Sequence, residues 1–387
     1  MTALSAIKVL DLTRLLPFAF GSMMLADLGA EVLKIEEPDK GDYMRMVGPK
    51  RKKESYIFLM CNRNKKSMTL DLRSNEGKEI LFKLVKDSDI LLESFRPGVA
   101  DRLGIGYETI REKNPKIIYC SATGYGQSGP YKDKPGHDIN YVSIAGILGM
   151  TGRHLEMPVI PGIPIADMSV GIFLAFAALV GIMARERTGE GQYIDISMTD
   201  IMVAYNIFHL AVHLSESEIS EDLNITGGAL FYESFETKDG KFISFGNVEK
   251  KFWDNFCEVI ERSDLKAYQF ASGDKKNELM RELREFFLSK TREEWLELLE
   301  NKEICYSPVN SIEEVFSDPH ILNQQMISEM DHPIEGKIKQ TGLPIKFSKT
   351  PFDLRLPPPV LGQDTIEILS KLGYKEKINE LKRAKVI

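Results

Sequence analysis

Residues 7–35, IKVLDLTRLLPFAFGSMMLADLGAEVLKI, set the pattern for the first half of the chain. Ile7–Leu12 is a short apolar run typical of a buried strand, and Phe18–Leu28 predicts a helix that ends at Gly29. Glu31–Ile35 then predicts a second strand. This order of strand, helix and strand favours a mostly parallel sheet.

The alternation continues well beyond this stretch. Ser74 is placed to cap a helix whose apolar residues share one face, and further short apolar runs predict strands at Thr69–Leu72, Asp89–Glu93, Lys116–Ala122 and Tyr193–Ile196. Strands alternating with helices predict an α/β fold, with a Rossmann-like large domain built on a parallel sheet covered by helices on both faces.

The sequence changes in character from about Asn224. Asp239-Gly240 separates two alternating segments, which is a strong signal for a β-hairpin, and charged helical segments follow. These features predict a smaller α+β domain. We expect a large Rossmann-like domain over residues 1–205, a linker helix and small α+β domain over 206–315, and a return segment over 316–387 that packs on the large domain.

Composition excludes several classes of protein. A net charge of −7 and a pI near 5.6 over 387 residues argue against a nucleic-acid partner. The four cysteines are scattered without a C-x-x-C pair, which indicates reduced thiols in a cytoplasmic protein. The apolar run Val170–Ala184 is shorter than the roughly 20 residues of a membrane span. We therefore expect a buried core helix there and no membrane partner.

Gly124–Gly129 matches G-x-G-x-x-G and follows a predicted strand. A dinucleotide site also needs a helix that opens at the third glycine, and Pro130 to Pro135 shows no apolar periodicity. This argues against NAD or FAD binding and indicates tight turns near His137. His209 and His213 lie four positions apart without a third ligand in view, so no metal site is predicted.

Basic residues gather at Lys50–Lys53 and again at Arg63, Lys65 and Lys66. They are interpreted either as a solvated surface or as an attractor for a polyphosphate ligand. Arginines also follow the ends of predicted strands, where open α/β sheets hold ligands: Arg73, Arg96 and Arg102.

Two residues are the best candidates for proton transfer. Asp167 precedes a long apolar helix, where it could act as an N-cap or as a carboxylate beside a developing negative charge. His137 lies between glycine and aspartate on a turn, which favours an accessible imidazole suited to acid–base chemistry.

Several stretches together resemble the class III CoA-transferase and α-methylacyl-CoA racemase superfamily, over almost the whole chain. They are Val9–Leu12, Leu25–Ala30, Asn62–Ser67, Phe95–Gly98, Gly124–Gly129, Ile165–Asp167, Arg187–Gln192 and Leu361–Gln363. Gly136–Tyr141 looks like the racemase motif that carries the catalytic histidine, and Gly246–Glu249 also resembles a racemase segment. Two positions depart from the racemase pattern: Glu37 stands where racemases often have arginine, and Tyr56–Asn62 is more typical of transferases.

The resemblance implies a homodimer of two interlocked chains and an acyl-CoA substrate, with no separate cofactor because CoA enters with the substrate. It implies catalytic roles for His137, Asp167 and Glu249, the last beside the histidine. The implied CoA contacts are Leu70, Asp71, Leu72, Arg73, Ser94, Phe95, Arg96, Arg102, Gly136, Asn140 and Tyr141.

The favoured activity is racemisation of 2-methyl-branched acyl-CoA thioesters through an enolate. His137 would act on one enantiomer and Asp167 on the other, with N–H groups at the Met168 helix start holding the enolate oxygen. The alternative is CoA transfer between carboxylic acids, in which Asp167 is a nucleophile and His137 is dispensable. A non-catalytic CoA-binding protein is a third possibility, for which Asp167→Ala would leave function unchanged.

Overall fold

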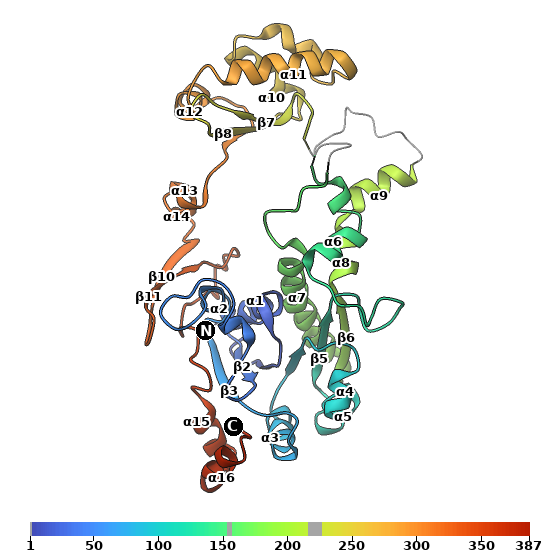
Figure 1. Cartoon of the computed structure of the whole chain (residues 1–387), viewed down its shortest axis with the longest axis vertical. Coiled ribbons are helices and arrows are strands. Elements are labelled where there is room, and N and C mark those ends of the chain that lie inside the picture. The colour runs from blue at the N-terminus through green and yellow to red at the C-terminus, as the bar shows by residue number, and fades with distance from the viewer. Residues whose placement is uncertain (1, 153–156, 216–226) are drawn as a thin grey trace. The chain divides into compact units, whose positions relative to one another are not determined.

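The computed structural model describes residues 2–152, 157–215 and 227–387. It divides into two compact units, which are treated separately: a large unit of Met1–Asn206 with Gln325–Ile387, and a small unit of Ile207–Gln324 (Figure 1). The chain therefore returns to the large unit at Gln325, whereas the sequence placed this return at residue 316.

The large unit is built on a six-stranded sheet in which every paired strand is parallel. The strand order is β3-β2-β1-β4-β5-β6, so the order reverses between β1 and β4. Ligands of open α/β sheets bind beyond the carboxyl ends of the strands at such a reversal. The strands are β1 Lys8–Asp11, β2 Glu31–Glu36, β3 Lys65–Thr69, β4 Ile90–Glu93, β5 Ile118–Thr123 and β6 Gln192–Ser197.

Helices cover both faces of this sheet, as predicted. Alternate strand residues point to opposite sides: Val9 packs in a core with α1, α6, α7 and α8, whereas Leu10 packs in another with α3, α5, α15 and α16. The helices of the large unit are α1 Leu15–Asp27, α2 Tyr56–Cys61, α3 Asn75–Val85, α4 Val99–Leu103, α5 Tyr107–Lys113, α6 Asp138–Ile144, α7 Ile165–Thr188, α8 Met198–Tyr205, α15 Thr365–Lys371 and α16 Ile378–Arg383, with 3₁₀ turns η1 Tyr43–Arg45, η2 Leu148–Met150 and η5 Lys375–Lys377.

The strand expected at Thr69–Leu72 lies earlier, at β3. Its residues Lys65, Lys66 and Ser67 are polar, and the buried Lys65 and Ser67 reach Asp11 and Glu36 respectively. An apolar pattern could not reveal a strand whose inward side chains are polar and paired. Ser74 does cap α3, since its hydroxyl accepts a hydrogen bond from the Gly77 N–H.

The central helix α7 packs along α1 in the middle of the large unit (Figure 1). Its length and composition would also allow a membrane span, but half of its most apolar window is buried within the structure. It is a core helix of this unit, as the sequence predicted.

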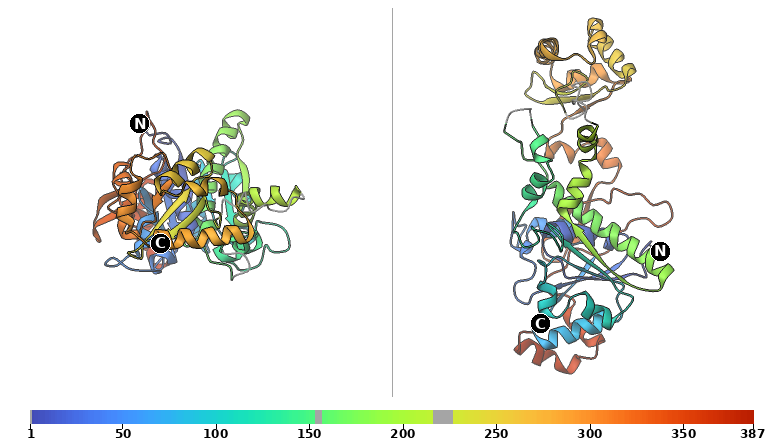
Figure 2. Two further views of the ribbon diagram at one scale, coloured as in Figure 1. Left: turned by 90° about the horizontal axis from the view of Figure 1, so that it is seen from above. Right: turned by 90° about the vertical axis from the view of Figure 1, so that its right-hand side faces the viewer.

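The small unit contains a three-stranded antiparallel sheet in the order β7-β8-β9, with helices against one face (Figure 2). The predicted hairpin is confirmed: β7 and β8 pair around Gly240, which has a φ of 72°. The aromatic core includes the fully buried Trp253 and Trp295. The elements are β7 Tyr232–Glu236, β8 Phe242–Gly246, β9 Tyr306–Pro308, α9 Ile207–Leu214, α10 Lys250–Val259, η4 Ser263–Tyr268, α11 Gly273–Phe287, α12 Arg292–Leu299, α13 Ile312–Val315 and α14 Pro319–Asn323.

The return segment adds a hairpin and two helices to the large unit. The hairpin joins β10 Ile327–His332 to β11 Gly336–Thr341. The carboxylate of Asp364 accepts a hydrogen bond of 2.8 Å from the Ser67 N–H, which ties the segment before α15 to β3.

Candidate active site

Asp167 lies in the first turn of α7, inside the helix. The interpretation of Asp167 as an N-cap is therefore wrong, because the helix begins at Ile165 and Pro164 occupies the N-cap position. The cap comes from Asp138, whose Oδ1 accepts hydrogen bonds of 2.7 Å from the Ala166 N–H and 3.2 Å from the Asp167 N–H. A carboxylate suits this place because the first N–H groups of a helix lack intrahelical partners.

His137 is exposed, as its position on a turn predicted. It is the N-cap residue of α6, and its backbone N–H donates to the side-chain oxygen of Asn140 at 3.0 Å. The same short segment therefore presents an accessible imidazole at His137 and a helix-capping carboxylate at Asp138.

The predicted turn glycines make room for a tyrosine beside this segment. A Cβ on Gly124 or on Gly136 would lie 2.4 Å or 2.8 Å from the Tyr141 ring. No helix opens at Gly129, which has a φ of 86°; turns follow, and α6 begins only at Asp138. The segment thus lacks the helix that a dinucleotide fingerprint requires.

Four ionisable side chains act electrostatically with Asp167. The pKa of Asp167 is raised to about 6, chiefly by burial and then by the charge of Asp138, while His137 opposes both effects. Burial also raises the pKa of Tyr43, with smaller contributions from Asp42 and Asp167. Burial, Tyr125 and Asp167 raise the pKa of Tyr141 to about 12. A carboxyl that titrates near neutral pH beside an imidazole suits proton transfer.

The structure corrects one detail of the predicted chemistry. The N–H of Met168 donates to the Pro164 carbonyl at 2.9 Å within α7. It is therefore already satisfied, and the role assigned to it in holding an enolate oxygen is wrong. What remains at this end of α7 is the partial positive charge of the helix N-terminus.

Most residues expected to contact CoA follow strands that end at one edge of the sheet. Leu70, Asp71, Leu72 and Arg73 follow β3, and Ser94, Phe95 and Arg96 follow β4, with Arg102 in α4. The turn after β1 meets them there, since the Arg14 N–H donates to the Ser94 hydroxyl at 3.1 Å.

The side chains of the residues expected to contact CoA differ in how exposed they are to a ligand. Leu70 is only 2% exposed, so its side chain belongs to the core. Arg73 is exposed and pairs with Asp71 at 2.8 Å and with Glu37 at 3.1 Å. Glu37, which stands where racemases often have arginine, therefore partners an arginine at the same edge. Gly136, Asn140 and Tyr141 lie beside His137, as described above.

Two members of the basic group are structural. Arg63 is 1% exposed and forms an ion pair of 2.6 Å with Asp27. Lys65 is also 1% exposed and donates to Asp11, Ser22 and Asn62, and burial lowers its pKa to about 8. The polyphosphate interpretation is wrong for both residues, because neither charge reaches the surface.

A side cavity near Arg96 contains a carboxyl that the sequence analysis overlooked. Glu93, at the end of β4, is buried among Tyr107, Tyr119 and Tyr193, and burial raises its pKa to about 7. Its Oε2 accepts a hydrogen bond of 2.6 Å from the Phe95 N–H. The available signal was a glutamate directly after three apolar residues of a predicted strand.

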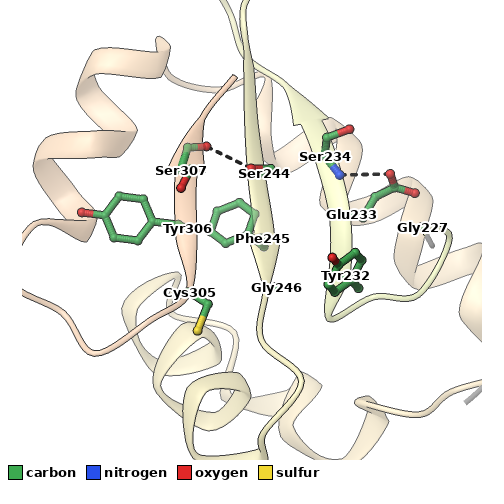
Figure 3. A pocket seen from close by; sticks show the side chains of 10 residues that line it. All are labelled: Gly227, Tyr232, Glu233, Ser234, Ser244, Phe245, Gly246, Cys305, Tyr306 and Ser307. Atoms are coloured by element: carbon green, nitrogen blue, oxygen red, sulfur yellow. Dashed lines mark hydrogen bonds between the residues drawn. The ribbon is translucent and has the colours of Figure 1, made fainter. Parts of the chain in front are cut away.

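Glu249 belongs to the small unit, where it is the N-cap residue of α10. The structure describes it within that unit only. A hollow on the same unit lies over the strands (Figure 3). It is lined by aromatic residues as well as by small and polar ones: Tyr232, Phe245, Tyr306, Ser234, Ser244, Ser307, Glu233, Cys305, Gly227 and Gly246. The predicted catalytic residues do not line this hollow.

No metal site emerges from the residues that the structure describes: no group of three or more His, Cys, Asp or Glu side chains is placed to hold an ion. His209 and His213 both lie on α9, as expected from their spacing.

Comparison with known proteins identifies the relatives of this chain. A sequence model of CoA-transferase family III matches residues 4–365. Human succinyl-CoA:glutarate CoA-transferase is 35% identical, over 99% of this chain and 90% of the relative. Human alpha-methylacyl-CoA racemase is 31% identical, over 100% of this chain and 97% of the relative. The crystal structure of a CAIB/BAIF family protein from Brucella suis superposes with a TM-score of 0.82 at 28% identity, covering 96% of this chain and 99% of that chain.

Proposed function

This chain belongs to CoA-transferase family III, and from that premise we propose that it inverts the α-carbon of 2-methyl-branched acyl-CoA thioesters. The observation that carries the proposal is the pairing of an exposed imidazole, His137, with a carboxyl, Asp167, whose pKa is raised to about 6. Inversion requires one group to remove the α-proton and a second group to return a proton to the other face.

In the proposed reaction, neutral His137 takes the α-proton from one enantiomer and protonated Asp167 supplies a proton to the enolate. The other enantiomer uses the same pair with the roles exchanged. A carboxyl with an ordinary pKa would rarely be protonated near pH 7, so the raised pKa of Asp167 supports this role. In this proposal the substrate binds with its developing negative charge toward the N-terminal end of α7, whose dipole stabilises that charge.

Two further assignments come from the family resemblance: Glu249 is a third catalytic residue, and CoA enters as part of the substrate without a separate cofactor. Composition and charge support a protein that acts in the cytoplasm without a membrane or nucleic-acid partner. The eleven residues expected to contact CoA bind that part of the substrate, with Arg73, Arg96 and Arg102 as its charged contacts.

We also propose that the protein is a homodimer. An apolar stripe on α7, made of Ile172, Phe176, Val180 and Met183, is 45–60% exposed. Exposed stripes of this kind are typical of protein interfaces. A second copy of the chain is the proposed occupant, in agreement with the interlocked dimer that the family implies.

CoA transfer between carboxylic acids is the second candidate, and one observation favours it. The human CoA-transferase is more similar to this chain than the human racemase is, at 35% against 31% identity. In that reaction Asp167 would attack the thioester to form a mixed anhydride and release the CoA thiolate. The thiolate would then attack the aspartyl carbonyl of the anhydride, which gives an aspartyl thioester and releases the donor acid as its carboxylate. His137 would have no necessary part.

The two candidates separate in one experiment. The purified protein is incubated in D₂O with a 2-methylacyl-CoA and no carboxylate acceptor. Deuterium at the α-carbon together with both enantiomers supports the racemase. Absence of exchange, combined with movement of CoA to an added dicarboxylate and a hydroxylamine-sensitive adduct on Asp167, supports the transferase.

A further inference from the structure

Asp138 connects the two candidate catalytic residues. It follows His137 directly in the chain, and its carboxylate reaches 28 and 29 residues ahead to the Ala166 and Asp167 N–H groups. The side chain of Asp138 therefore holds the backbone of Asp167, while its own backbone continues from His137. A movement of α6 relative to α7 would stretch both hydrogen bonds.

The same contact places a negative charge beside the Asp167 carboxyl. Like charges at short range disfavour ionisation, and half-burial of Asp167 strengthens the effect by reducing solvent screening. A neutral cap such as serine or asparagine would satisfy the same N–H groups without this effect. A carboxylate at position 138 therefore adds a negative charge beside Asp167, which capping of the helix alone does not require.

We propose that Asp138 is a positioning residue for Asp167, because it fixes the first turn of α7 through the Ala166 and Asp167 N–H groups. Its negative charge beside Asp167 is the second consequence of the same contact. This inference rests on the proposed function for its catalytic meaning. In this account the side chain of Asp138 acts through Asp167.

Other ionisable groups also face Asp167. His137 and Tyr141 approach from the segment around α6, and Tyr43 approaches from η1. Among them, His137 lowers the pKa of Asp167, whereas Asp138 raises it. When Asp138 is replaced, burial should be the remaining effect that raises the pKa of Asp167 against the lowering effect of His137.

Asp138→Asn separates charge from capping, because an amide oxygen still accepts both hydrogen bonds. Asp138→Ala removes both functions, and Asp133→Asn on the preceding exposed loop is the matched control. The pKa of Asp167 is measured directly by NMR titration of the whole protein labelled with ¹³Cγ-aspartate, with Asp167→Asn used to assign the signal. We expect Asp138→Asn to lower this pKa by about one unit, and the control to leave it unchanged.

The same variants are then assayed for α-hydrogen exchange across pH. For the enantiomer that Asp167 deprotonates, the acid limb of the rate profile should move to lower pH in Asp138→Asn with KM nearly unchanged. For the other enantiomer the alkaline limb should move in the same direction, and Asp138→Ala should in addition lower kcat. An unchanged Asp167 pKa in folded Asp138→Asn overturns the inference. A lowered pKa without any α-hydrogen exchange in the wild-type protein upholds the role of Asp138 and contradicts the proposed racemase instead.

Discussion

Gly21 of α1 and Gly171 of α7 lie in direct backbone contact. A Cβ on Gly21 would be 2.4 Å from the Gly171 carbonyl oxygen, and a Cβ on Gly171 would be 2.5 Å from the Pro17 carbonyl oxygen. Asp167 lies one helical turn before Gly171. The close approach of two glycines therefore sets the position of the turn that carries the candidate carboxylate.

Gly171→Ala should destabilise the large unit, because the added methyl group meets backbone that cannot rotate away. We expect a loss of about 1–3 kcal/mol in the free energy of unfolding, even though alanine favours helix, together with reduced turnover. Denaturant titration measures the change. Gly149→Ala is the control, since its Cβ would meet nothing within 4 Å; equal effects of the two substitutions would refute the packing argument.

Asp167→Asn should stabilise the protein at alkaline pH. The pKa of Asp167 is raised to about 6 in the fold, so ionisation costs folding free energy as pH rises from the ordinary aspartate range through about 6. The amide avoids this cost. The difference in Tm between variant and wild type should be positive at pH 8 and shrink as pH falls below 6. A difference that is constant with pH would show that the carboxyl has an ordinary pKa.

Arg63→Gln should be severely destabilising, with a loss of about 3–5 kcal/mol, because it leaves Asp27 buried without its ionic partner. Lys66→Gln breaks a pair of 2.7 Å between exposed side chains, Lys66 and Glu31, and should cost about 0–1 kcal/mol. Urea unfolding of both variants measures the contrast. If both variants lost similarly little free energy of unfolding, Arg63 would be a surface charge that a phosphate group could reach.

Phe176→Glu should prevent assembly of the proposed homodimer, because the glutamate places a charge in the middle of the apolar stripe on α7. Light scattering coupled to size exclusion should give twice the chain mass of 43.8 kDa for the wild type and the single mass for the variant. Arg187→Glu, at an exposed polar position on the same helix, should remain dimeric. A monomeric wild-type protein would exclude the dimer.

Local patterns in the sequence predicted much of the fold. Apolar runs located β1, β2, β4, β5 and β6, and Asp239-Gly240 located the hairpin, because these signals depend on neighbouring residues. Strand β3 was expected too late in the chain, at Thr69–Leu72, because the partners that allow Lys65 to be buried come from β1 and α1.

The candidate site was predicted in part for the same reason. His137 and Asp167 were recognisable from their local surroundings and from the family motifs. The cap on α7 was not, because Asp138 is 28 residues from Ala166 in the chain. Satisfaction of the Met168 N–H likewise depended on where the helix begins, which an apolar pattern locates only within a few residues.

The two-base account is tested most directly by α-deuterium incorporation from each enantiomer of one 2-methylacyl-CoA, measured separately for wild type, His137→Ala and Asp167→Asn. The account predicts that the wild type exchanges both enantiomers, that His137→Ala loses exchange from one and keeps part of the other, and that Asp167→Asn shows the opposite preference. Normal exchange of both enantiomers by His137→Ala would contradict the account. Loss of exchange from both enantiomers in Asp167→Asn, while His137→Ala keeps exchange, would also contradict it.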